Sequence, residues 1–206
     1  MSLWREDDAW KTIRKAYRIM RGMNAGFRTQ FVQAAYAECW IAFKLAQAGY
    51  DVKFHEGKCD LSVELHDSKE HHIVNFEIKH SQDNKDPDSK GHGYSSWVIS
   101  KPQVEEKKFH LCVLVRDSLT NEEPDAAYVF SLKEIATTEP IDVNAPRKDY
   151  YLWYSTNFKE IKKDHKWMRG AANPLVESLN RNPFEFTERW ENILSGNLHL
   201  VLKDVS

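Results

Sequence analysis

Residues 59–79 have the sequence CDLSVELHDSKEHHIVNFEIK, in which two segments of alternating apolar and polar residues flank the polar stretch HDSKEHH. Alternation with a period of two is typical of a half-buried β-strand, and a polar stretch between two such strands predicts a β-hairpin. If Leu65 pairs with His72, the antiparallel register sets every other pair. Asp60 then lies opposite Glu77.

The two faces of this hairpin differ in character, because side chains alternate between the faces of a strand. The apolar face comprises Leu61, Val63, Leu65, Val74, Phe76 and Ile78, and we expect it to lie in the core. The polar face comprises Asp60, Ser62, Glu64, Asn75, Glu77 and Lys79. Like charges directly opposite each other destabilise a sheet, so Asp60 and Glu77 call for a positive group between them. The Lys79 ammonium or a divalent cation could supply it.

The segments on either side of the hairpin predict a mixed α/β protein. In chain order we expect an amphipathic basic helix over about 8–20, a core helix over 29–47, strands over 50–54, 97–100, 110–116 and 126–131, and short helices after Ser100 and over 132–136. Residues 82–95 are almost free of apolar side chains and predict a long loop. Strands interleaved with helices favour a mixed central β-sheet flanked by helices.

Composition limits the remaining choices. The chain has 206 residues and 41% apolar side chains, enough for one packed domain, which we divide into a basic N-terminal helix (1–27), a core (28–136) and a C-terminal extension of uncertain role (137–206). No apolar run reaches the length of a membrane span and the N-terminus has no secretory pattern, so we expect a cytoplasmic protein without a membrane partner. The three cysteines lie too far apart in sequence to indicate a disulfide framework or a zinc site.

Charge excludes one simple class of partner interaction. The formal net charge is −2, which lacks the strong basic excess of a protein that binds nucleic acid through overall charge. Any contact with nucleic acid must come from local basic patches, such as residues 9–21 and 159–169.

Asp60, followed by Phe76-Glu77-Ile78-Lys79, resembles the D…(D/E)xK core of the PD-(D/E)XK, or restriction-endonuclease-like, nuclease superfamily. The resemblance spans roughly residues 29–136, where the order of helix, three strands, helix and strand is also similar. Cys59 departs from the pattern, which has proline before the aspartate. The resemblance implies a restriction-endonuclease-like α/β fold and a metal-dependent endonuclease that hydrolyses phosphodiester bonds in DNA.

The resemblance also implies a role for each motif residue. Asp60 and Glu77 would bind Mg²⁺ or Mn²⁺, with Glu38 of the core helix as a third acid, and Lys79 would position the attacking water. Glu38 lies along an apolar stripe of its helix, so either a metal or Lys79 meets its carboxylate, or the helix turns it to solvent.

Several further residues are candidates for contact with nucleic acid, each with a simpler structural explanation. Gln103 fits a capping box with Ser100, and the basic helix fits an ordinary solvated surface. The candidate contacts are Lys85, Lys90, Gln103, Arg14 and Arg18. His80 follows the motif on the apolar side of its strand, so we interpret it as a packed core histidine.

Two other functions compete with the nuclease. The same fold can serve as a catalytically inactive module that binds nucleic acid or protein, and the ExK pair can be an ordinary surface ion pair. A glycoside hydrolase is disfavoured by the lysine beside the acids. The sequence leaves open whether the chain forms the homodimer that symmetric cutting of DNA would require.

Overall fold

The computed structural model describes most of the chain. The described residues are 10–16, 19, 28–55, 59–66, 71–82, 84–85, 93–118, 121–144, 147–159 and 173–205.

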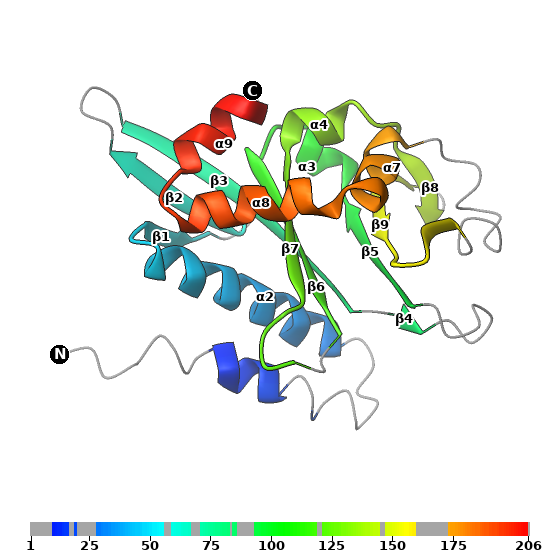
Figure 1. The fold of residues 1–206 in the computed structure, drawn as a ribbon, viewed down its shortest axis with the longest axis horizontal. Helices are drawn as coiled ribbons and strands as arrows, with labels where there is room; N and C mark the ends of the chain where they lie inside the picture. Colours follow the sequence, from blue (N-terminus) through cyan, green and yellow to red (C-terminus); the bar gives the residue numbers. More distant parts are fainter. Residues whose placement is uncertain are drawn as a thin grey trace.

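A five-stranded mixed sheet forms the centre of the molecule (Figure 1). Its strands, in spatial order, are β1 (Asp51–Phe54), β2 (Leu61–His66), β3 (His71–Gln82), β6 (Leu111–Asp117) and β7 (Ala126–Ser131). Neighbouring strands are antiparallel except β3 and β6, which are parallel and therefore need the long connection that separates them in sequence. The mixed sheet expected from the alternation of strands and helices is confirmed.

Helices cover one face of this sheet and enclose the first part of the core. They are α2 (Arg28–Gln47), α8 (Pro183–Leu194) and α9 (Leu198–Val205), and α8 also reaches the other face, where its Phe186 stacks on Phe130 of β7. Trp40 and Ile41 of α2 pack with Trp190 and Ile193 of α8 against the apolar side chains of the hairpin. Residues beyond 137, whose place the sequence did not predict, thus complete the core beside α2.

A second sheet covers the other face, opposite α2 (Figure 1). Its strands, in spatial order, are β4 (Asn84–Lys85), β5 (Gly93–Ile99), β9 (Arg147–Tyr154) and β8 (Ile141–Asn144), and α3 (Lys101–Glu105), α4 (Leu132–Ala136) and α7 (Pro174–Arg181) flank them. The long loop expected over 82–95 is corrected in part, because β3 continues to Gln82 and β5 begins at Gly93.

The hairpin register agrees with the prediction, with one correction. Leu65 pairs with His72, and the ladder runs down to the pair of Leu61 with Phe76. Asp60 lies just before β2 rather than in a strand pair with Glu77, because its own carboxylate accepts the hydrogen bond from the backbone N–H of Ile78 at 2.6 Å. A side chain thereby takes the place of the next ladder bond.

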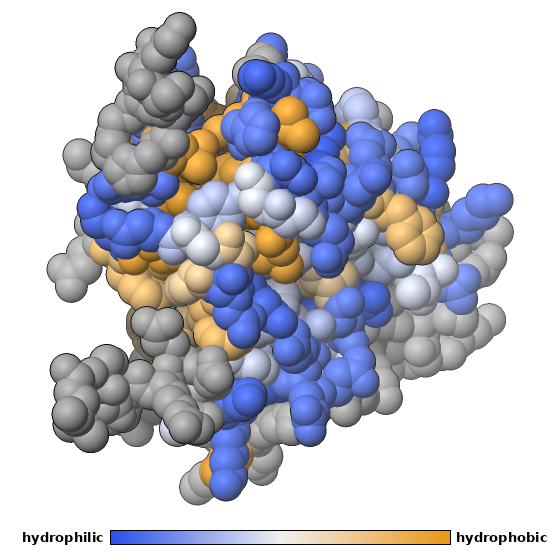
Figure 2. All heavy atoms as spheres, turned by 60° about the vertical axis from the view of Figure 1, so that its left-hand side comes forward, coloured by the Kyte–Doolittle hydropathy of each residue, from blue (hydrophilic) through white to orange (hydrophobic). Residues whose placement is uncertain are grey.

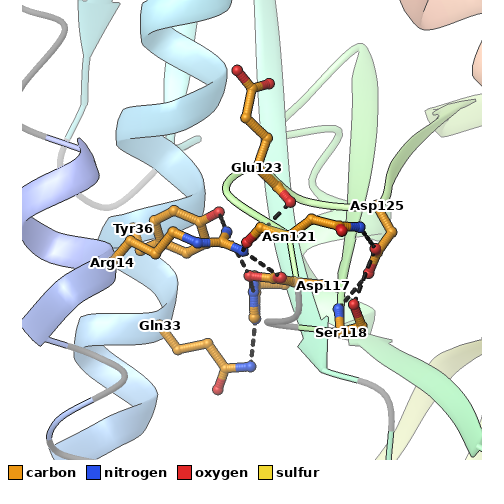
Figure 3. Close-up of polar contacts among 9 residues, drawn as sticks. Arg14, Gln33, Tyr36, Asp117, Ser118, Asn121, Glu123 and Asp125 are labelled. Carbon is orange, nitrogen blue, oxygen red and sulfur yellow. Dashed lines mark hydrogen bonds and ion pairs between the residues drawn. The ribbon is translucent and has the colours of Figure 1, made fainter.

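A buried ion pair ties the N-terminal helical residues 10–16 to the sheet (Figure 3). Both terminal nitrogens of the Arg14 guanidinium donate to Asp117, over 2.9 and 3.0 Å, and the arginine is only 3% exposed. The guanidinium also donates to the Tyr36 hydroxyl and to the carbonyl of Asn121 at 2.7 Å. Arg14 therefore joins the N-terminal helix, α2 and the connection between β6 and β7.

His80 extends this network onto β3. Its side chain is 1% exposed, its Nε2 lies 3.5 Å from an Asp117 oxygen, and its ring meets Tyr36 edge-on. Gln33 bonds to its Nδ1. Burial lowers the pKa of His80, although Asp117 opposes the shift. The packed core histidine expected at this position is confirmed.

No helix among the described residues is both long and apolar enough to cross a membrane. Figure 2 shows the molecule turned so that the left-hand side of Figure 1 comes forward. Hydrophilic side chains cover much of this face and surround a group of apolar ones.

Replacing Arg14 by methionine is expected to lower the free energy of unfolding by about 3–5 kcal/mol, because the Asp117 carboxylate would stay buried without its partner. Urea denaturation followed by circular dichroism measures this loss. The control Lys101→Met removes a half-exposed pair with Glu105 and should cost less than about 1 kcal/mol. Small and equal losses in the two variants would contradict a structural role for Arg14.

Candidate active site

The candidate site lies where β2 begins and β3 passes it. Asp60 is held at the start of β2 by the Ile78 N–H, while Glu77 and Lys79 leave β3 on the same face, two residues apart. Glu77 is 1% exposed and lies beside Cys112 in the parallel ladder to β6. Lys79 is more open, with 26% of its side chain exposed to solvent.

The two carboxylate oxygens of Glu77 have different surroundings. Oε1 accepts hydrogen bonds from the Lys79 ammonium and from the side-chain amide of Gln103. Oε2 is buried, and no described residue donates to it. A buried carboxylate oxygen without a donor is costly, so this atom is suited to bind a positive group.

Three acids of the site carry raised pKa values. Burial raises the pKa of Glu77, of Asp60 and of Glu38, and their mutual repulsion adds to it, while Lys79 opposes the shift in each case. Glu38, on α2, is half-buried and lies within electrostatic range of Asp60, Glu77 and Lys79. Its placement brings a third acid toward the motif.

Lys79 is held in its charged form. Burial lowers the pKa of the Lys79 ammonium, but Glu77 and Asp60 outweigh this effect, and the net pKa is raised. A lysine with a raised pKa is a hydrogen-bond donor and a positive charge, not a general base.

Gln103 takes the capping role that the sequence suggested and also bonds to Glu77, which the sequence analysis did not predict. Its carbonyl oxygen accepts from the backbone N–H and the hydroxyl of Ser100, over 3.2 and 2.8 Å, which completes the capping box of α3. Its amide nitrogen donates to Glu77. The cap thus fixes the side chain that in turn orients the Glu77 carboxylate.

Of the other residues predicted to contact nucleic acid, one is buried and the side chains of the rest are not described. Arg14 is buried in its pair with Asp117, so the solvent-facing phosphate contact expected there is corrected. Lys85 lies in β4, at the end of the second sheet, and only its backbone is described. Arg18 and Lys90 lie outside the described residues.

No three His, Cys, Asp or Glu side chains within the described ranges converge closely enough to form a complete metal cage. Mg²⁺ does not need one, because it commonly uses one or two protein carboxylates and completes its shell with water and phosphate oxygens. Glu77 Oε2 and the carboxylate of Asp60 match that requirement.

Two features of the site escaped the sequence analysis. Burial raises the pKa of the Cys112 thiol well above its usual value, and the charges of Glu77 and Lys79 act on it, so a neutral side chain lines the floor of the site. Directly after β1, His55 bonds to Ser62 of β2. The alternation of polar Lys53, apolar Phe54 and polar His55 could have placed His55 on the polar face of the sheet.

The chain matches no protein-family model, no curated protein and no solved structure. A function is therefore inferred from the side-chain geometry.

Glu38→Gln is expected to stabilise the metal-free protein at neutral pH by roughly 1 kcal/mol or less, because it removes a half-buried charge from a cluster of acids. The folded pKa of Glu38 lies above the unfolded value of 4.5, so the folded state binds protons more tightly. The wild-type protein consequently loses stability as the pH rises above this value.

The advantage of Glu38→Gln should therefore be largest at neutral pH and vanish as the pH falls well below 4.5, where Glu38 is protonated in both states. Urea titrations of both proteins across this pH range measure the difference. Glu105→Gln, an exposed acid of α3, is the matched control and should show no such pH-dependent advantage. An advantage of wild type at neutral pH would contradict the burial argument.

Proposed function

We propose that this protein is a metal-dependent endonuclease of restriction-endonuclease-like fold that hydrolyses phosphodiester bonds in DNA. The observation that carries the proposal is the Glu77 carboxylate, buried with one oxygen bound by Lys79 and Gln103 and the other left without a donor. Folding would not favour such an arrangement for its own sake, because an unpartnered buried oxygen destabilises the protein. A ligand that joins Glu77 to Asp60 resolves the cost.

Mg²⁺ or Mn²⁺ fits this site by the chemistry of its donors, which are hard carboxylate oxygens. Asp60 and Glu77 would hold the ion, and Glu38 lies near enough in electrostatic terms to share it. When bound, the ion offsets negative charge on a phosphodiester and makes water more acidic. The raised pKa values of the three acids support a cation here, since a cation would relieve their mutual repulsion.

Lys79 supplies the fixed positive charge of the proposed reaction. Its ammonium is oriented by Glu77 and reaches toward solvent, so it can donate to the attacking water or to a phosphoryl oxygen as negative charge develops there. Water attack forms the new P–O bond while the bond to the leaving oxygen breaks. Gln103 and the capping box hold Glu77 in place throughout.

A purified wild-type protein should cut DNA in Mg²⁺ or Mn²⁺, and Lys79→Ala should cut at least about 100-fold more slowly, because a preorganised charge at a reacting centre contributes on that scale. Gel assays on plasmid and single-stranded DNA measure the rates. Lys133→Ala, an exposed lysine of α4, is the control and should retain the wild-type rate.

Mg²⁺ should also raise the melting temperature of the wild-type protein, by roughly 5–10 °C at saturating concentration. The rise should vanish in Asp60→Asn and Glu77→Gln. A rise without cleavage of any nucleic acid would favour the alternative function, an inactive binding module. Neither a rise nor cleavage, or cleavage that survives Lys79→Ala, would overturn the proposal.

A further inference from the structure

Strand β1 extends the polar face that carries the candidate site. Lys53 pairs with Ser62 across β1 and β2, and the N–H of His55 donates to the carbonyl of Asp60 at 3.1 Å, which continues the pairing by one step beyond the strands. Because side chains alternate, Lys53 and His55 project on the same side of the sheet as Ser62 and Asp60. An imidazole therefore stands beside the first acid of the motif.

The orientation of His55 is set by a buried hydroxyl. The residue is exposed, yet its Nε2 lies 2.6 Å from the Oγ of Ser62, and Ser62 is only 2% exposed. An exposed side chain gains little stability from being ordered, because ordering it costs conformational entropy. No described residue bonds to its other ring nitrogen, Nδ1, which leaves that atom available to a ligand.

The charges on this part of the face are already balanced. Lys53 pairs with Glu64 of β2, and no described acid forms an ion pair with His55. Ser62 Oγ and Nε2 share one hydrogen bond, and when the hydroxyl is its donor, Nδ1 carries the ring proton. A donor N–H directed out of a face that holds Asp60 and Lys79 matches the oxygen of a phosphate.

We propose that His55, positioned by Ser62, binds the phosphate next to the one that is cleaved, and so favours polynucleotides over substrates with a single phosphodiester. This inference rests on the proposed function, because it assumes a nucleic acid at the Asp60, Glu77 and Lys79 site. His55 contacts the substrate, whereas Ser62 is a positioning residue that acts through His55.

The test measures the binding of a short fluorescent DNA duplex by anisotropy in Ca²⁺, a hard cation with the same preference for oxygen ligands as Mg²⁺. His55→Gln and Ser62→Ala should each raise the Kd about tenfold, the usual effect of losing one hydrogen bond to a charged group. Ser62→Thr keeps the hydroxyl and should restore wild-type binding, which a purely structural effect at Ser62 would not do. His72→Gln, on the opposite face of β3, is the matched control.

Hydrolysis of bis(p-nitrophenyl) phosphate, which has one phosphodiester, supplies the second readout. His55→Gln should leave kcat/KM for this compound unchanged while it raises KM for DNA. Equal losses on both substrates, or no loss of DNA binding, would overturn the role of His55 while leaving the nuclease intact. A wild-type protein that neither binds nor cuts DNA would instead overturn the proposed function, and this inference with it.

Discussion

The burial of the Glu77 carboxylate is the constraint on which the site depends. Glu77 lies on β3, on the face of the central sheet that the second sheet and α3 cover. Only 1% of the residue is exposed to solvent. A charge in such a place must be paired and hydrogen-bonded, or its pKa shifts until it is neutral. Lys79 and Gln103 meet the requirement for one oxygen only.

Helix α3 supplies one of these hydrogen bonds. Ser100 caps the helix through Gln103, and the same side chain then reaches Glu77. A short helix of five residues has little stability of its own, so its cap and its packing decide where it lies. The geometry of the acid is therefore set by an element whose sequence looks purely structural.

Strand β3 is fixed from both of its faces. On one face Glu77 and Lys79 form the candidate site, and on the other His80 packs into the network of Arg14, Asp117 and Tyr36. Two adjacent residues, Lys79 and His80, thus belong to different polar clusters separated by the thickness of the sheet. Because buried polar groups with satisfied hydrogen bonds specify one arrangement of the chain, movement of β3 would disturb both clusters at once.

The sequence predicts local features well where the physics is local. Alternation, together with the pair of Leu65 with His72, gives the hairpin register down to the pair of Leu61 with Phe76, and a capping pattern marks the helix after Ser100. Asp60 lies outside the β2–β3 pairing, because its carboxylate accepts the Ile78 N–H in place of a backbone carbonyl. The alternation of side chains between two faces does not predict such a bond.

Long-range pairs could not be predicted in this way. Arg14 and Asp117 are separated by 103 positions, and nothing in a run of cations near the N-terminus distinguishes the one that will be buried. The second sheet was missed for a related reason, since β9 pairs with β5 across some fifty residues and its aromatic sequence, YYLWY at 150–154, fits several kinds of buried segment. Contacts of this kind depend on the whole fold.

The acids of the site show why its residues weaken the fold they belong to. Asp60, Glu77 and Glu38 all have raised pKa values, so at neutral pH each ionised carboxylate carries a cost that the unfolded chain does not. One lysine offsets part of the repulsion and leaves a net negative charge. Natural proteins tolerate such costs at sites where a ligand relieves them, because the binding free energy of the ligand returns to the folded state. The instability of the empty cluster and its affinity for a cation therefore have the same electrostatic origin.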